Sequence, residues 1–154
     1  TDGDALRQAV RAEPGIVSPN VLEAEELIGQ EFGDDEDRAG AVREIVALGA
    51  REALMTTPDG CWAQVMVDGS PQLFRVTIAP REPVATAGSG DAFLAGYLAA
   101  RYSGSPPEEC LRFGVACGAE STGRLGAGLI DPRAADRLRS EVELTAVELR
   151  ARVG

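Results

Sequence analysis

Short apolar segments with strand character alternate with segments of helical periodicity, and this alternation restricts the fold of the chain more than any other feature. The helical segments cover residues 3–13, 20–29, 38–48 and 91–102, the residues after Pro107 to about 122, and a short stretch from Pro132. The strand-like segments cover residues 16–18, 52–57, 61–67, 73–78 and 142–147. Because each strand and helix must bury one face against another element, this order predicts a layered α/β sheet.

The length of the chain, 154 residues, suits one globular domain with a core of its own. No internal repeat and no low-complexity linker divides it. The longest apolar runs, such as residues 92–100, are far shorter than a membrane span, and the first residues lack the pattern of a signal peptide. We therefore expect a protein that does not enter a membrane.

The charge balance of the chain is acidic. Fifteen basic residues against 25 acidic ones give a formal net charge of −10. A chain with this balance repels the phosphate backbone of nucleic acids and the surface of anionic lipids. Neither a nucleic acid nor a membrane surface is therefore an expected partner.

Two residue types are missing. The sequence contains no histidine, and all 15 basic residues are arginine, so it contains no lysine either. These absences exclude Ser-His-Asp and Cys-His catalysis, histidine metal ligands, Schiff-base lysines and the lysine of a Walker A phosphate loop. Any proton transfer must rely mainly on carboxylates.

The three cysteines, Cys61, Cys110 and Cys117, form no C-x-x-C motif and are odd in number. This spacing argues against a disulfide scaffold or a zinc ribbon and is consistent with a reducing cytoplasm. Free cysteine is among the residue types most often buried. We expect these thiols to fill the core.

The most informative segment, residues 85–96, reads A-T-A-G-S-G-D-A-F-L-A-G. Phe93 stands where a dinucleotide-binding G-x-G-x-x-G motif needs its third glycine, and the missing lysine excludes a Walker A motif. What remains is a turn of small residues that leads directly into a helix. Successive backbone N–H groups at such a helix start, from Gly88, Ser89 and Gly90, can bind an anion.

Asp91 follows this turn directly. A carboxylate beside a bound phosphate is unfavourable unless it takes a proton from the hydroxyl that attacks the phosphate. The pattern is therefore typical of phosphoryl transfer with Asp91 as the base. The spacing alone is equally consistent with Asp91 as the N-cap of the following helix.

A second polar pair, Asn20 and Glu23, lies three residues apart at another helix start. Their amide and carboxylate oxygens could hold a hydrated Mg²⁺, which keeps most of its waters in proteins. Taken alone, the spacing of these two residues favours a capping pair over a metal site. In the acidic stretch at residues 34–37 we likewise favour a solvated helix start over a metal site, because acidic side chains match the positive end of a helix dipole.

Together these motifs resemble the C-terminal half of the PfkB family, the ribokinase-like sugar kinases. The family hallmark D-T-x-G-A-G-D appears as A-T-A-G-S-G-D, ending at Asp91, and the family motif N-x-x-E appears as N-V-L-E from Asn20. Residues 49–62 resemble the family segment that leads into a nucleotide-contacting turn, and residues 118–128 resemble the adenine-side loop. The resemblance covers essentially the whole chain and implies a ribokinase-like layered sheet with helices on both faces.

The resemblance also implies a role for each matching residue. Asp91 would be the catalytic base, and the backbone of Gly88, Ser89 and Gly90 would be the anion hole for the γ-phosphate. Asn20 and Glu23 would organise Mg²⁺ through water. The residues expected to bind the nucleotide are Thr56, Thr57, Gly60, Gly118, Gly126 and Gly128.

Two motifs are similar to those of one branch of the family, the 1-phosphofructokinases and tagatose-6-phosphate kinases. They are P-N-x-x-E-x-E-x-L from Pro19 and the closing E-V-E-L from Glu141. That branch implies ATP- and Mg²⁺-dependent phosphorylation of a sugar or sugar phosphate, with a homodimer as a further expectation. Family members are longer, and their N-terminal half carries the sugar-binding residues and the lid. Residues 1–154 are therefore expected to be the nucleotide-binding and catalytic part, inactive or weakly active alone. The alternative is a remnant that binds a nucleotide or a partner without turnover.

Overall fold

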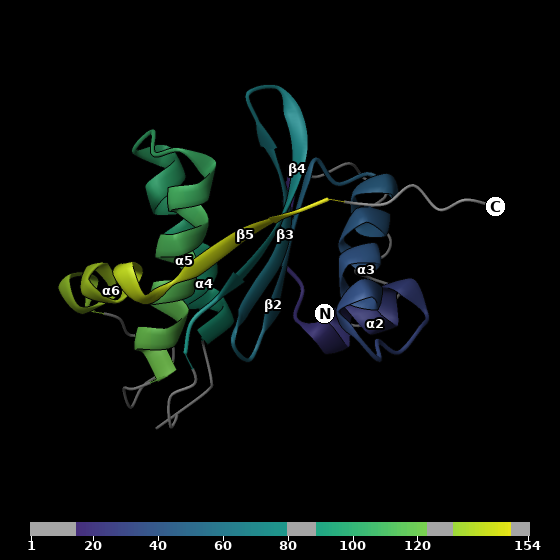
Figure 1. Ribbon diagram of the computed structural model, residues 1–154, viewed down its shortest axis with the longest axis horizontal. Coiled ribbons are helices and arrows are strands. Elements are labelled where there is room, and N and C mark those ends of the chain that lie inside the picture. The colour runs from purple at the N-terminus through teal and green to yellow at the C-terminus, as the bar shows by residue number, and fades with distance from the viewer. Residues whose placement is uncertain (1–14, 80–88, 123–130, 149–154) are drawn as a thin grey trace. The chain divides into compact units, whose positions relative to one another are not determined.

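The structure is a computed structural model that describes residues 15–79, 89–122 and 131–148 (Figure 1). The helix expected at residues 3–13 lies outside the described residues, as do Gly88, Gly126 and Gly128.

Strands and helices alternate as the sequence predicts, and the α/β class is confirmed. The strands are β1 (Ile16–Val17), β2 (Glu52–Thr57), β3 (Gly60–Val67), β4 (Ser70–Thr77) and β5 (Glu143–Val147). The helices are α2 (Val21–Ile28), α3 (Asp35–Ala47), α4 (Ser89–Tyr102), α5 (Pro107–Thr122) and α6 (Pro132–Leu138), followed by the 3₁₀ turn η1 (Arg139–Glu141). The described strands form one sheet in the order β1-β2-β3-β4-β5, in which β1 runs parallel to β2 with Ile16 opposite Glu52.

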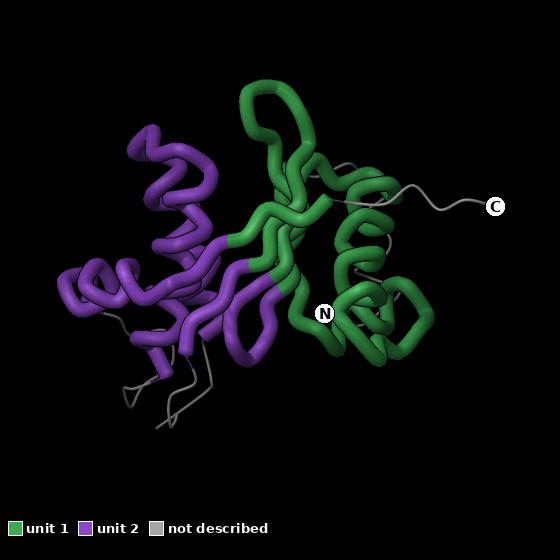
Figure 2. Tube along the Cα trace, in the orientation of Figure 1, with its two compact units in different colours: residues 1–55, 62–75, 145–154 green, residues 56–61, 76–144 purple. Residues whose placement is uncertain are grey.

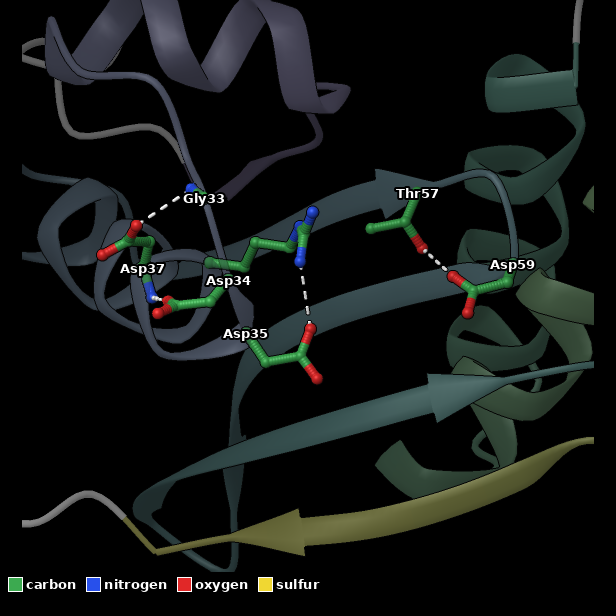
Figure 3. A network of polar contacts seen from close by, with 7 residues as sticks. Gly33, Asp34, Asp35, Asp37, Thr57 and Asp59 are labelled. Carbon is green, nitrogen blue, oxygen red and sulfur yellow. Dashed lines mark hydrogen bonds and ion pairs between the residues drawn. The ribbon is translucent and has the colours of Figure 1, made fainter.

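The start of α3 corrects one predicted boundary. The helix begins at Asp35 rather than at residue 38, because the carboxylate of Asp34 accepts a hydrogen bond from the Asp37 backbone N–H at 2.8 Å (Figure 3). The acidic stretch is thus the N-cap and first turn of α3, as its charge predicts. Among the described residues, no group of three or more acidic, histidine or cysteine side chains could hold a metal ion.

Two further elements, β4 and α4, also begin earlier than predicted. Strand β4 begins at Ser70 rather than at residue 73, because Asp68 and Gly69 both have positive φ angles, of 50° and 81°, and turn the chain within two residues. Helix α4 begins at Ser89 rather than at Asp91, so the G-S-G-D motif enters the helix itself.

The chain divides into two compact units, which Figure 2 colours separately. The first unit contains residues 1–55, 62–75 and 145–154. Its core packs helices α2 and α3 against strand residues; the buried members are Val17, Ala24, Leu27, Ala39, Val42, Ile45, Ala50, Ala53, Met55, Trp62 and Leu73. The Arg75 guanidinium lies 5.0 Å from the centroid of the Trp62 ring, a cation–π contact.

The second unit contains residues 56–61 and 76–144. Helices α4 and α5 pack closely side by side in it. Its buried side chains include Cys61, Val76, Phe93, Tyr97, Cys110, Leu111, Val115, Cys117, Ala135 and Val142. All three cysteines are buried and unpaired with one another, so the prediction that they fill the core is confirmed.

Membrane insertion was not expected from the sequence. Within the described ranges, every helix is too short or too polar to cross a bilayer.

Candidate functional site

The G-S-G-D motif lies at the start of α4. Ser89 is the first residue of the helix and is half-buried, whereas Gly90 and Asp91 are exposed in its first turn. The first backbone N–H groups of an α-helix have no acceptor within the helix, and they lie at the positive end of its dipole. The structure therefore presents donors and an accessible carboxylate together, in a helix of 14 residues. Gly88, the remaining residue of the predicted anion hole, lies outside the described residues.

The next turn of α4 anchors this helix start. Ala92 and Phe93 are buried, and Phe93 lies against Gly114 and Gly118 of α5. The neighbouring helix comes so near that a Cβ built on Gly118 would lie 3.3 Å from the Ser89 carbonyl oxygen and 3.5 Å from the Phe93 Cβ. The first turn of α4 thus carries the G-S-G-D motif and packs against a glycine of α5.

Asn20 and Glu23 form a complete capping box at the start of α2. The Glu23 backbone N–H donates to Asn20 Oδ1 at 2.8 Å, and the Asn20 backbone N–H donates to Glu23 Oε1 at 3.2 Å. The structure therefore shows the capping role that the spacing left open. The pair also fits a hydrated Mg²⁺, because it offers one amide and one carboxylate oxygen, and two protein groups suit an ion that keeps most of its waters. Asn20 and Glu23 belong to the first unit and Asp91 to the second.

Thr56, Thr57 and Gly60 lie at the hairpin between β2 and β3. The Thr57 hydroxyl donates to Asp59 Oδ1 at 2.8 Å (Figure 3), and the Asp59 carbonyl accepts from the Ile78 backbone N–H at 2.8 Å. Gly60 has a φ of 152°, and a Cβ on it would collide with the Val76 carbonyl oxygen. Backbone packing alone thus requires glycine at position 60, whatever its role toward a nucleotide.

The predicted adenine-side residues divide between described and undescribed segments. Gly118 lies within α5, where it packs against α4, and Gly126 and Gly128 lie outside the described residues. The structure brings Gly118 together with Ser89 rather than with the hairpin of Gly60.

Sequence reasoning did not single out Glu120. Its side chain is buried in α5, and Oε2 accepts a hydrogen bond from the Asp131 backbone N–H at 2.8 Å. Asp131 is in turn the N-cap of α6, where its carboxylate accepts from the Arg133 backbone N–H at 3.0 Å. Glu120 thereby ties the start of α6 to the end of α5. The sequence feature that could have indicated this role is the position of Glu120, three residues after Cys117 on the apolar side of a helix.

Burial disfavours the thiolate form of two cysteines in the second unit, Cys110 and Cys117. Burial, with a smaller contribution from the Glu120 charge, raises the pKa of Cys117 to about 11. Burial also raises the pKa of Cys110. A thiol is nucleophilic as the thiolate, so at neutral pH both side chains are inert. Asp91 is then the exposed acid–base group of the G-S-G-D motif.

This chain is similar in sequence to known proteins. Residues 3–134 match the pfkB family carbohydrate kinase model. A 1-phosphofructokinase from Rhodobacter capsulatus is 33% identical over 133 residues, which are 86% of this chain and 41% of the relative.

Solved structures show the same fold. Phosphofructokinase-2 from Escherichia coli, in complex with substrates and products, superposes with a TM-score of 0.78 at 27% identity, covering 90% of this chain and 45% of that one. Ribokinase from Arabidopsis thaliana, complexed with ribose and ATP, superposes with a TM-score of 0.70 at 29% identity, covering 81% of this chain and 40% of that one. This chain thus spans less than half the length of these relatives. On the family match across most of its residues, the chain belongs to the pfkB family of carbohydrate kinases.

Proposed function

We propose that this chain is the nucleotide-binding and catalytic part of an ATP-dependent kinase that phosphorylates a sugar phosphate, in the manner of a 1-phosphofructokinase. The observation that carries the proposal is the start of α4, where Ser89, Gly90 and the exposed Asp91 occupy the first turn of a helix. The backbone donors of a helix start beside an exposed carboxylate are what transfer of a phosphoryl group to a hydroxyl requires.

In the proposed reaction, Asp91 accepts the proton of the substrate hydroxyl. The oxygen of that hydroxyl forms a bond to the γ-phosphorus of ATP, and the bond from this phosphorus to the β,γ-bridging oxygen breaks, so that ADP leaves. The backbone N–H groups of Gly88, Ser89 and Gly90 donate to the γ-phosphate oxygens and stabilise the charge that they carry in the transition state.

Magnesium, when bound, would neutralise charge on the phosphates. Asn20 and Glu23 are the residues that we propose to hold it through water, because their oxygens are of the type that Mg²⁺ prefers. In the capping box each side chain uses one oxygen, and a carboxylate can accept several hydrogen bonds, so capping and binding of metal-bound water are compatible.

The nucleotide itself is proposed to contact the β2–β3 hairpin and the stretch from Gly118 to Gly128. At the hairpin, the half-buried Thr56 and Thr57 and the backbone of Gly60 would approach the phosphates. This stretch would flank the adenine, as the family resemblance implies. A homodimer is part of the same proposal.

A second candidate function is nucleotide binding without turnover. It is favoured by one observation, that the chain covers only 41% of the Rhodobacter capsulatus 1-phosphofructokinase. Positioning of a second substrate contributes up to about 7–11 kcal/mol of the barrier reduction in enzymes, so a nucleotide site without a sugar site would bind ATP and turn over poorly.

Two measurements on the 154-residue chain separate these candidates. Calorimetry with Mg²⁺ and ATP tests the nucleotide site that both candidates share. ADP release in the presence of fructose 1-phosphate, fructose 6-phosphate, tagatose 6-phosphate or ribose tests turnover and the substrate class. Binding with sugar-phosphate-dependent ADP release supports the kinase, and binding without it supports the second candidate. An absence of binding contradicts both.

A further inference from the structure

Helices α4 and α5 run antiparallel, and small residues set their register. Gly96 of α4 lies against Cys117 and Phe113 of α5, and Phe93 lies against Gly114 and Gly118. Residues nearer the start of α4 contact residues nearer the end of α5, so the end of α5 lies against the start of α4. In Figure 1 both helices are drawn in green and lie side by side.

The contact nearest the start of α4 involves the first turn of that helix, Ser89 to Asp91, which is the proposed phosphate-binding turn. A Cβ on Gly118 would lie 3.3 Å from the carbonyl oxygen of Ser89, closer than a Cβ ordinarily comes to an oxygen. The obstacle is a backbone atom in the first turn of a helix, so it cannot move by rotating a side chain. A side chain at position 118 therefore presses on the backbone of the turn that carries the N–H groups of Ser89, Gly90 and Asp91, which would have to give way by a few tenths of an ångström.

A second observation points to a polar ligand at this end of the helix pair. Ser121 lies three residues after Gly118 on α5, is 1% exposed, and its hydroxyl has no hydrogen-bond partner in the described part of the chain. A buried hydroxyl without a partner destabilises a fold, so such a group calls for a partner that binds there. A phosphate oxygen, or a water bound to it, is a partner of the right kind.

We infer that Gly118 is a positioning residue for phosphate binding: by allowing α5 to approach the Ser89 carbonyl, it holds the first turn of α4 where its N–H groups meet the γ-phosphate. This inference rests on the proposed function. It also gives Gly118 a task beyond the adenine-side role implied by family resemblance, because its contact in the structure is with the phosphate-binding turn.

The test compares ATP with ADP, which differ only in the γ-phosphate. We expect Gly118→Ala to weaken Mg²⁺-dependent ATP binding about tenfold, equivalent to one hydrogen bond to a charged group, while ADP affinity changes little. Gly118→Val, with a larger side chain, should extend the same trend. Calorimetry of the wild-type and variant chains with each nucleotide measures the ratio of the two affinities.

Gly96→Ala is the matched control on the same helix pair. Its Cβ would lie 2.6 Å from Cys117 Sγ, a tighter clash than that at Gly118, but it lies about two turns along α4 from the motif. We expect this variant to lower the free energy of unfolding at least as much as Gly118→Ala and to leave the ratio of ATP to ADP affinity unchanged. Equal shifts of the ratio in both variants, or an equal loss of ATP and ADP affinity in Gly118→Ala, would overturn the inference.

A readout without nucleotide keeps the inference separate from the proposed function. Backbone amide signals of Ser89, Gly90 and Asp91 in NMR spectra should move in Gly118→Ala and stay in place in Gly96→Ala. Unmoved signals in Gly118→Ala contradict the positioning contact itself. If these signals move but the wild-type chain binds neither nucleotide, the contact is confirmed, the proposed function has failed, and the phosphate role of Gly118 fails with it.

Discussion

Gly60 approaches the backbone of Val76 so closely that a Cβ on Gly60 would overlap the Val76 carbonyl oxygen. The φ angle of Gly60, 152°, is one that side-chain-bearing residues rarely adopt. Both features arise where the β2–β3 hairpin meets the end of β4. The glycine that family resemblance marks for nucleotide contact is therefore also required by the packing of the sheet.

Gly60→Ala should lower the free energy of unfolding by about 3 kcal/mol or more, because it adds a steric clash to a strained backbone angle. Gly69→Ala is the matched control, because Gly69 also has a positive φ but open space around its Cα; we expect a loss of about 1 kcal/mol there. Urea unfolding of both variants measures the difference. Similar losses in the two variants would show that the contact with Val76 is unimportant.

In a full-length kinase that contains this chain, Asp91→Asn should lower kcat for sugar-phosphate-dependent ADP formation by about 100-fold or more, since a positioned base contributes roughly that factor. ATP affinity should be unchanged or higher, because the substitution removes a negative charge beside the bound phosphates. Glu36→Gln provides the control, as Glu36 is an exposed carboxylate in the first turn of α3. Unchanged kcat in Asp91→Asn would contradict the assignment of the base.

Glu120→Ala should lower the free energy of unfolding by about 2 kcal/mol, because it leaves the Asp131 N–H without its charged acceptor. Glu120→Gln keeps an acceptor oxygen at the same place and should lose less. Arg133→Ala is a useful comparison, because its backbone N–H still donates to Asp131 while its exposed side chain is removed. Equal stability of the alanine and glutamine variants would argue against this hydrogen bond.

Ser121→Ala should leave the free energy of unfolding of the nucleotide-free chain unchanged or raise it by about 1 kcal/mol, because it removes a buried hydroxyl that lacks a partner. Affinity for ATP should fall several-fold if a phosphate or its water supplies that partner. Thermal unfolding with and without Mg²⁺ and ATP measures both effects. A clear loss of stability without nucleotide would mean that the hydroxyl is already satisfied.

Alkaline pH should destabilise the folded chain. The pKa of Cys117 rises from 9.0 to about 11 on burial, so above pH 9 the unfolded chain loses this proton while the folded chain retains it. The stabilising contribution is therefore complete below pH 9 and is lost as the pH rises toward 11. Tyr97 acts in the same direction, because burial and the nearby Cys110 and Cys61 raise its pKa.

Urea titrations at a series of pH values measure this slope. Cys117→Ala should flatten the decline without abolishing it, because Tyr97 and Cys110 still contribute. An identical slope in the variant would contradict the assignment to Cys117.

The parts of this protein that follow from local physics were predictable. The spacing of Asn20 and Glu23 allowed two alternatives, a capping box and a metal site, and the structure shows the capping box. The acidic start of α3 follows from helix-dipole chemistry, but the helix begins at Asp35 rather than at residue 38, because Asp34 caps the Asp37 backbone N–H. The start of α4 was predicted at Asp91, whereas the helix includes Ser89 and Gly90. Such errors reflect the conformational freedom of glycine and serine at a helix start.

By itself, the sequence determined the α/β class, the family, and a chemistry confined to carboxylates and backbone amides, because these depend on periodicity within a few residues and on residue types that are present or absent. Only the tertiary structure decided why position 60 requires glycine and why glycine at position 118 allows a close approach of two helices, since the neighbouring atoms are the carbonyl oxygens of Val76 and Ser89, which lie far from them along the chain. It also decided that Glu120 bonds to the start of α6. Close approach between distant backbone segments has no signature in local sequence, because it depends on how whole elements pack.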